Sequence, residues 1–373
     1  MMSNFIKSVF LVALLYGTQV SNAQEQKSQN QLDGPYLLYK GDSILVKVAT
    51  HISKEKAEVQ SSAQPLSNKE NLVLDVQFSN AKEKNFQVKL KKTIEVEPSV
   101  WKQPKEMFVM SDIEGEFDAF RNLLLANKII DGKYEWIFGK GHLVICGDLF
   151  DRGKDVPAAL WLIYKLEEAA KAKGGYVHTI LGNHDIMNLA NNLKYLDKKY
   201  LLSAAAMGHP YVELYNENTE LGRWLRSKNL IEKIGENLFL HGGISPEVNN
   251  LKLSVQEINN ISRPYLGWEN LKNTVKDEKV LNIFNSKTGL FWYRGYFDEP
   301  PLDEKVLDEI LAFQKAKKIV VGHTILDDNI RFHYQGKVLA IDVNQHKGDH
   351  QAVFYKDKKW YKLNLTGNKT LLN

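Results

Sequence analysis

Five loops of this sequence each carry a side chain that can bind a divalent cation. Asp112, Asp148 and Asn183 offer oxygen atoms, and His241 and His323 offer imidazole nitrogens. Two cations a few ångströms apart can hold both the attacking and the leaving oxygen of a phosphoryl transfer, and they need such ligands together with one shared carboxylate. A single aspartate after a strand is more often a turn former. Five such loops in succession favour a two-cation centre for phosphoryl transfer.

Each of the five loops follows a short apolar run that predicts a β-strand. The runs span residues 107–110, 143–146, 176–181, 238–240 and 319–321. Amphipathic segments predict helices at roughly 116–127, 156–173, 254–265 and 303–317. Strands that alternate with helices indicate an α/β fold, in which ligands bind outside the carboxyl ends of the strands. We therefore expect the five loops to converge on one crevice.

A different pattern precedes residue 100. Short segments at 43–48, 72–76 and 86–90 alternate polar with apolar residues and predict strands that have one wet face. Pro98 and Pro104 bracket the change to strands that alternate with helices. We expect a small β-rich N-terminal domain at 24–100 and a catalytic domain at 101–373. The first domain carries no catalytic constellation, and its sequence does not distinguish a partner-binding module from a brace.

Residues 1–23 have the layout of a secretory signal peptide. Lys7 precedes an apolar run at 9–16, and small polar residues lead to Ala23. The run is shorter than the roughly 20 residues of a spanning helix, and no cysteine near the predicted cut offers a lipid anchor. We expect an exported protein, periplasmic or secreted, with no stable membrane insertion after cleavage. The alternative is a buried N-terminal helix or an anchor.

Composition narrows the classes of function. Forty-nine basic side chains against forty-five acidic ones leave an excess of four, spread in mixed runs, so nucleic acid is not an expected partner. Cys146 is the only cysteine and cannot form an internal disulfide. Because it closes an apolar run, we expect a buried structural thiol rather than a nucleophile.

Three longer motifs make the sequence resemble the calcineurin-like metallophosphoesterases, and within them the phosphoprotein phosphatase branch. The motifs are GDLFDRG at 147–153, GNHD at 182–185 and HGGISP at 241–246. Further segments resemble the bacterial Shewanella-like phosphatases: LGRWLRSK at 221–228, WYRGY at 292–296 and VGHT at 321–324. The resemblance covers residues 106 to about 345. It implies an αββα sandwich of two mixed sheets flanked by helices, preceded here by the small β-rich domain.

The resemblance also implies how two divalent cations are held. It makes Asp148 the bridging ligand, places Asp112 at the first cation, and places Asn183, His241 and His323 at the second. A water that bridges the cations, with its pKa lowered toward neutrality, is then the nucleophile that attacks phosphorus.

Four further residues match the family's positions for catalysis and phosphate binding. His184 matches the general acid for the leaving oxygen, and Asp151 is expected to pair with it and favour the imidazolium. Arg152 and Arg294, together with Asn183, are expected to hold the phosphate, for which a guanidinium fork is well suited. For Arg294, stacking or an ion pair within its aromatic segment is the alternative.

The sequence departs from the family at Glu114, where the usual motif has a histidine that binds the first cation. If Glu114 coordinates, a carboxylate in place of an imidazole favours Mn²⁺ or Mg²⁺ over Zn²⁺. We expect Mn²⁺, with Fe, Zn or Mg also possible. The alternative is that Glu114 faces solvent and the first site is weak.

Residues 193–229 separate the third and fourth motifs and form an expected lid, rich in aromatic residues. These are Tyr195, Tyr200, Tyr211, Tyr215 and Trp224. Such side chains suit the ring of a phosphotyrosine, as the resemblance implies, and they equally suit the packing of a helical lid. We keep both interpretations.

We predict a metal-dependent phosphatase for phosphate monoesters, acting on phosphorylated proteins or peptides with a preference for phosphotyrosine. A second enzymatic hypothesis is a hydrolase of diadenosine polyphosphates or another small phosphoester. A hypothesis of another class is a non-catalytic phosphate-binding module. The intact set of Asp148, Asp151, Arg152, Asn183 and His184 argues against it, because an acid and its carboxylate partner serve leaving-group departure.

Overall fold

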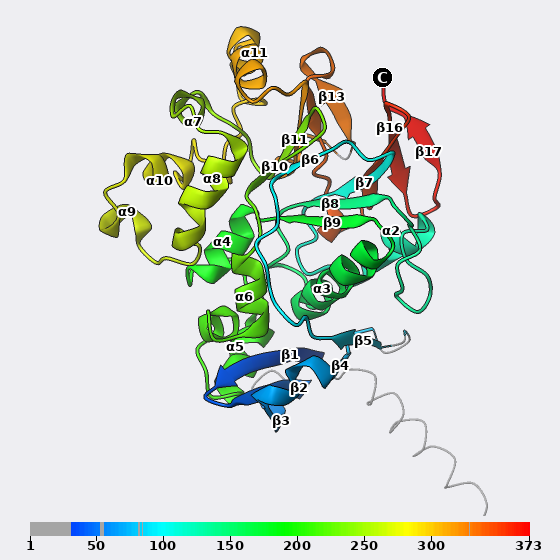
Figure 1. Ribbon diagram of the computed structural model, residues 1–373, viewed down its shortest axis with the longest axis vertical. Coiled ribbons are helices and arrows are strands. Elements are labelled where there is room, and N and C mark those ends of the chain that lie inside the picture. Colours follow the sequence, from blue (N-terminus) through cyan, green and yellow to red (C-terminus); the bar gives the residue numbers. More distant parts are fainter. Residues whose placement is uncertain (1–30, 53–55, 81–82, 84, 328) are drawn as a thin grey trace, which may run out of the picture.

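The computed structural model describes residues 31–52, 56–80, 83, 85–327 and 329–373 (Figure 1). The predicted signal peptide at 1–23 lies outside the described residues. Among the helices of the described ranges, none combines the length and the apolar character needed to cross a membrane.

Two six-stranded sheets form the centre of the molecule. The first has the strand order β13-β14-β12-β11-β10-β6, and the second has the order β17-β16-β15-β7-β8-β9. Strands of the first sheet are β6 (Val100–Trp101), β10 (Ile231–Ile234), β11 (Asn237–Leu240), β12 (Lys318–Val321), β13 (Arg331–His333) and β14 (Val338–Ala340). Strands of the second are β7 (Glu106–Met110), β8 (His142–Cys146), β9 (Tyr176–Ile180), β15 (Gln351–Lys356), β16 (Lys359–Asn364) and β17 (Lys369–Leu371).

Both sheets mix parallel and antiparallel pairs. In the second sheet β7, β8 and β9 are parallel neighbours, while β15 pairs with β7 in the antiparallel direction. In the first sheet β11, β12 and β14 are parallel neighbours. The carboxyl ends of parallel neighbours share one edge of a sheet, so the loops that follow them are brought together. All five strands predicted to deliver metal ligands are present.

Helices cover the outer faces of the two sheets (Figure 1). Helix α3 contacts β9 on one side, and α8 contacts β10 on the other. The α-helices are α2 (Phe117–Ala126), α3 (Val156–Ala172), α4 (Asn183–Leu189), α5 (Lys198–Ala206), α6 (Glu220–Arg226), α7 (Pro246–Asn250), α8 (Val255–Ser262), α9 (Leu271–Thr274), α10 (Glu278–Ile283) and α11 (Glu304–Phe313). Helices α2, α3, α8 and α11 match the four predicted segments, and the predicted αββα sandwich is confirmed.

Alternate residues of the central strands fill two different layers. Met107 and Val109 of β7 pack between the sheets with Val144 and Val320, whereas Phe108 belongs to the layer beneath the helices. The space between the sheets also holds Cys146, which is fully buried as predicted. Burial raises the pKa of this thiol well above its usual value, which makes it a poor nucleophile.

The N-terminal region is rich in strands, as predicted. A three-stranded sheet consists of β1 (Gln31–Lys40), β2 (Ser43–Ile52) and β3 (Ala57–Pro65), and a two-stranded sheet consists of β4 (Val73–Val76) and β5 (Phe86–Lys89). In β5, Phe86 and Val88 are buried while their neighbours are exposed, so the strand has the predicted single wet face.

These strands pack directly on the catalytic part of the chain. The β1–β3 sheet lies against α5 and α3 at one end of the molecule (blue in Figure 1). Trp161 of α3 donates a hydrogen bond to the Pro35 carbonyl over 2.9 Å, and the Phe86 ring stacks on Phe117 of α2 at 5.9 Å. Both parts share one continuous apolar core. The division into two domains near residue 100 therefore stays a prediction, since a shared core does not separate two independently folding parts.

Candidate active site

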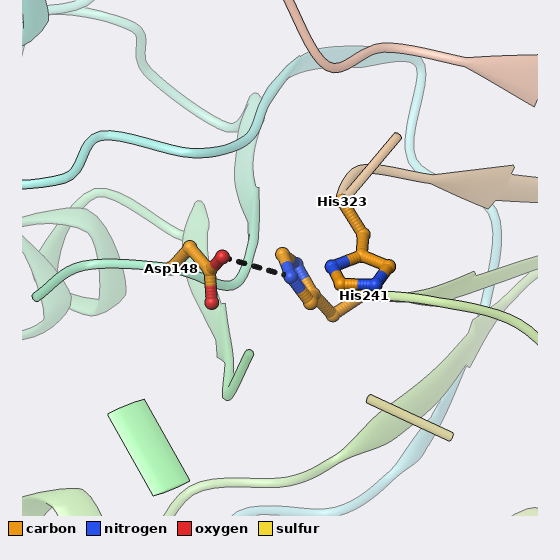
Figure 2. Close-up of side chains that lie close together, drawn as sticks. All are labelled: Asp148, His241 and His323. Carbon is orange, nitrogen blue, oxygen red and sulfur yellow. Dashed lines mark ion pairs between the residues drawn. The ribbon is translucent and has the colours of Figure 1, made fainter. Parts of the chain in front are cut away.

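The loops that follow the parallel strands meet in one buried cluster. Asp148 follows β8, His241 follows β11 and His323 follows β12, and one ligand atom from each of these residues lies within 4.8 Å of the others. Figure 2 shows the Asp148 carboxylate turned toward the two imidazoles, with its Oδ2 3.0 Å from His241 Nε2. This trio, the first trio below, is one of two candidate cation sites and contains ligands expected at the second cation.

A second trio shares the same carboxylate. Ligand atoms of Glu114, Asp148 and His184 also lie within 4.8 Å of one another, and all three residues are buried. Two adjoining sites that share one carboxylate are the arrangement that a two-cation centre requires. Asp148 occupies that shared position.

Hydrogen bonds fix the imidazole of His241 for coordination. Its Nδ1 lies 2.8 Å from the Cys146 carbonyl, which leaves Nε2 directed at Asp148 and at Asn183 Oδ1, 3.0 Å away. A backbone carbonyl on the other nitrogen is the usual support of a metal-binding histidine. His323 Nε2 is buried without a hydrogen-bond partner among the described residues. Oxygen and imidazole donors, one of them unsatisfied, fit a divalent cation.

Electrostatics favour the protonated form of His241, whereas burial lowers the pKa of His323 to about 2. Burial lowers the pKa of His241, but the charges of Asp148 and Asp112 outweigh burial and raise this pKa to about 10. Burial opposes ionisation of Asp148 as well, yet the neighbouring His241 charge brings the net pKa of Asp148 below its ordinary value. The acidic cluster thus retains a proton that a bound cation would displace.

Asp112 lies in the same crevice but in neither trio. Its carboxylate accepts hydrogen bonds from the Ser111 hydroxyl and from the backbone N–H of His323, the latter over 3.2 Å. Burial is the main reason that the pKa of Asp112 is raised to about 6. The structure therefore places Asp112 beside the predicted ligands, turned toward the backbone of the His323 loop.

Glu114 is buried, with 5% of its surface exposed, so the alternative in which it faces solvent is wrong. Its carboxylate forms an ion pair with the guanidinium of Arg152 and also belongs to the second trio. The Arg152 side chain is 37% exposed, and its backbone N–H donates to the Tyr195 carbonyl over 3.3 Å. Glu114 thereby connects the predicted phosphate-binding arginine to the second trio, which corresponds to the predicted site of the first cation.

Arg294 reaches the crevice from the segment before α11. Its Nη1 donates to the His323 carbonyl over 2.6 Å and to Thr324 Oγ1 over 3.1 Å. Arg294 has no acidic partner within 4.0 Å among the described residues, so the ion-pair alternative for this residue is wrong. An exposed guanidinium next to a candidate metal ligand is available to an anion.

His184 and Asp151 form a buried pair at the start of α4. His184 Nδ1 lies 2.6 Å from Asp151 Oδ2, and Asn188 Nδ2 donates to the other oxygen over 2.8 Å. His184 Nε2 points toward Asp148 Oδ2, 3.8 Å away. Burial lowers the pKa of His184, but the hydrogen bond that its ring donates to Asp151 and the nearby carboxylate charges raise this pKa overall. The pair can therefore carry and present a proton.

The backbone of these loops is held in a rarely occupied conformation. Six site residues have φ between 48° and 74°: Asp112, Glu114, Asp148, Asp151, Arg152 and His323. Left-handed conformations are uncommon for residues other than glycine and cluster at functional sites. Glycine is required where loops touch, since a Cβ on Gly182 would lie 2.2 Å from Asp148 Oδ1.

Sequence reasoning missed two carboxylates and one amide of the site. Asp185 accepts hydrogen bonds from the backbone N–H groups of Leu149 and Gly182, so it ties the second and third loops together. Asp342 is buried after β14, and burial together with the charge of Asp112 raises its pKa well above the usual value. An apolar run at 338–341 precedes Asp342, the same signal that identified the five loops. No pattern in the sequence indicates the role of Asn188.

The predicted lid at 193–229 consists of α5, the 3₁₀ turn Tyr211–Tyr215 and α6. Four of its aromatic side chains are buried and pack against one another or against neighbouring elements: Tyr200, Tyr211, Tyr215 and Trp224. Tyr195 differs, because 41% of its surface is exposed and its ring centroid lies 5.1 Å from that of His184. One lid aromatic is therefore available to a substrate.

Comparisons with known proteins agree with this geometry. The profile of the calcineurin-like phosphoesterase family matches residues 107–327. Shewanella-like protein phosphatase 1 of Plasmodium berghei is 30% identical over 228 residues, which cover 59% of this chain and 61% of that protein. Shewanella-like protein phosphatase 2 of Arabidopsis thaliana is 23% identical over 294 residues, covering 66% and 73%. The chain thus matches less than two thirds of the Plasmodium relative's length.

A solved structure shows a closer overall match. The crystal structure of a cold-active protein-tyrosine phosphatase from a psychrophilic Shewanella species superposes with a TM-score of 0.81 at 32% identity. The match covers 92% of this chain and 99% of that chain.

Proposed function

Since the chain belongs to the calcineurin-like phosphoesterase family, we propose that this phosphatase hydrolyses phosphate monoesters at a two-cation centre. The observation that carries the proposal is the shared carboxylate of Asp148, which belongs to both candidate cation sites. Asn183 and the two imidazoles of His241 and His323 complete one site, and Glu114 is the additional acid of the other. Asp112, whose pKa is influenced by the charges of His241 and Asp148, is proposed as a further ligand.

The chain's own residues then divide the work of hydrolysis. Divalent cations supply Lewis-acid activation of water and neutralise charge on the phosphoryl oxygens. Arg152 and Arg294 bind the phosphate oxygens through their guanidinium forks. His184 donates the proton on Nε2 to the departing oxygen, and Asp151 holds the ring in place through Nδ1. Because the leaving oxygen takes that proton, the product alcohol departs neutral.

Chelation followed by re-addition of single metals tests the proposal. The chain from Gln24 is expected to lose hydrolysis of para-nitrophenyl phosphate after chelation and to regain it with Mn²⁺, because the sites are rich in carboxylate oxygen. Metal at 100 times its Kd should also add about 2.7 kcal/mol of stability, visible as a Tm higher by several degrees. A metal-dependent Tm without hydrolysis would favour the phosphate-binding module. If added metal neither restored hydrolysis nor raised the Tm, the two-cation centre would be contradicted.

The pH dependence of turnover tests the roles of His184 and Asp151. Asp151 helps to raise the pKa of His184, so the acid form persists to higher pH. Asp151→Asn removes this support, and the alkaline limb of kcat should move to lower pH by about one unit or more. The exposed Asp75→Asn is the control. If the alkaline limb of kcat does not move, a group other than His184 determines its pKa.

We propose phosphotyrosine as the preferred substrate because Tyr195 lies beside the proton donor. The group attached to the leaving oxygen must pass next to His184, whose ring is 5.1 Å from that of Tyr195. The name of the Shewanella structure, a protein-tyrosine phosphatase, supports the same choice. Phosphorylated proteins or peptides are the proposed partners.

Substitution of Tyr195 tests this preference. Tyr195→Ala is expected to raise KM for a phosphotyrosyl peptide by about 3- to 10-fold, the equivalent of one aromatic contact, and to leave a phosphoseryl peptide nearly unchanged. Tyr195→Phe, which keeps the ring, should behave as the parent. Equal losses on both peptides would contradict an aromatic contact, and faster turnover of a diadenosine polyphosphate would favour the small-phosphoester alternative.

We also propose export to the periplasm or the medium, because residues 1–23 have the layout of a signal peptide. Cell fractionation that finds the chain shortened by its first 23 residues outside the cytoplasm would support it. Retention of the full-length chain in the cytoplasm would contradict it.

A further inference from the structure

A groove of about 1120 Å³ lies at the sheet edge opposite the active site. The first residues of β7, β8 and β9 line it, namely Glu106, His142 and Tyr176, together with β6 and the end of β15. The candidate metal ligands follow the other ends of the same strands, which are five residues long and therefore span about 16 Å. The groove is separate from the catalytic crevice.

Lysines dominate the rim of the groove. Its five lysines against two acids leave an excess of three positive charges: Lys102, Lys105, Lys140, Lys171 and Lys356 against Glu106 and Asp357. Lys171 pairs with Glu97, and Lys356 pairs with Glu106. Lys102, Lys105 and Lys140 are exposed and have no acidic partner within 4.0 Å in the described part of the chain. Three cations on one groove are thus available to an anionic ligand.

The floor is apolar and fixed in place. Trp101 donates from Nε1 to the Pro98 carbonyl over 2.7 Å, and its ring packs on Tyr176 with centroids 4.1 Å apart. Phe138 and Val100 continue this surface, and Val100 is 55% exposed. His142, at the base, is hydrogen-bonded to His178 over 2.8 Å, which in turn contacts buried Glu232. A rigid apolar floor beneath a cationic rim suits a ligand that carries both apolar and negatively charged groups.

The glycines that line the groove offer no tight phosphate site. The N–H groups of Gly141, Gly174 and Gly175 donate to carbonyls within the protein over 3.0, 3.0 and 2.9 Å, so they form no anion-binding cradle. Lysine ammonium groups on flexible stems act as point charges, which suits carboxylates spread along a chain. The groove also exceeds the roughly 300–1,000 Å³ of small-molecule pockets. An extended segment fits these features better than a nucleotide.

We propose that this groove docks an extended acidic peptide segment of a partner protein, whose apolar side chains lie on Trp101 and Phe138 while its carboxylates meet the three available lysines. Charge complementarity selects the partner, and the apolar floor adds contact area. The active site stays open, because it lies at the other end of the strands. The proposal does not depend on the proposed catalytic activity.

Fluorescence anisotropy with a labelled, unphosphorylated peptide of alternating glutamate and leucine tests the proposal on the chain from Gln24. Wild type should bind it and should bind the matching glutamine peptide much more weakly. The groove variant Lys102→Glu/Lys105→Glu/Lys140→Glu should weaken binding by about tenfold or more. A control of equal net charge, Lys133→Glu/Lys276→Glu/Lys287→Glu, changes exposed lysines elsewhere and should stay within about twofold of wild type. Hydrolysis of para-nitrophenyl phosphate should be unchanged in both.

Several results would overturn the proposal. Equal affinities of the groove variant and its control would show that net charge alone attracts the peptide. Displacement of the peptide by ATP or duplex DNA that binds more tightly would assign the groove to a nucleotide or a nucleic acid. Concentration-dependent dimerisation in sedimentation that the groove variant abolishes would identify a second copy of this chain as the occupant. The charge-reversed lysines are exposed, so the variants should fold.

Discussion

Asp148→Asn is expected to remove both cations and nearly all turnover. The carboxylate belongs to both candidate sites, and His241 Nε2 is 3.0 Å from it. Changes to groups that merely support metal ligands typically reduce metal affinity by about 10- to 100-fold. A shared ligand affects two sites at once, so the combined loss should be about 10²- to 10⁴-fold. An amide keeps the shape of the side chain but loses the charge that balances the cations.

Metal content measured by mass spectrometry after dialysis should fall from two ions per chain toward none, in parallel with kcat. The exposed Asp75→Asn, which makes the same chemical change on β4, should keep both. Mn²⁺ should also cease to raise the Tm of Asp148→Asn, which separates lost binding from slower chemistry. A variant that retains two ions would show that the carboxylate is not shared. Loss of only one ion would place Asp148 in a single site.

The loops of this site could be predicted because the signal is local. An apolar run of strand length that is followed by polar residues locates the carboxyl end of a strand, and parallel neighbours bring those ends together. The same rule applies to Asp342 after residues 338–341, although the preceding run was not used. Helices α2, α3, α8 and α11 were predictable for a similar reason, since each has one apolar face along a continuous segment.

Contacts between separate loops could not be predicted from any one of them. Glu114 was ambiguous because burial and the ion pair with Arg152 depend on where two loops meet. The lid posed the same difficulty, since five aromatic residues look alike in sequence while only Tyr195 is left beside His184. The groove at the opposite edge also combines residues from four distant segments. In each case the deciding property is a neighbour that the chain brings from elsewhere.

His184→Ala is expected to reduce kcat more for substrates whose leaving oxygen must be protonated before it departs. General acids contribute about 10²- to 10⁴-fold, so a poor leaving group such as an alkyl or seryl oxygen should show a loss of this size. Para-nitrophenolate departs readily without a proton and should show a much smaller loss. KM should change little, because Arg152 and Arg294 still bind the phosphate. The control His209→Ala removes an imidazole from a pair with Glu213 in the lid.

A double variant separates the proton donor from its partner. His184 Nδ1 and Asp151 Oδ2 are 2.6 Å apart, and residues that act as one unit show strongly non-additive losses. His184→Ala/Asp151→Asn should therefore be about as slow as His184→Ala alone, since Asp151 has no ring left to orient. Multiplied losses would mean that Asp151 contributes through another contact, such as Asn188. Equal losses for good and poor leaving groups would assign His184 to positioning or metal binding instead of proton donation, in keeping with its place in the trio with Glu114 and Asp148.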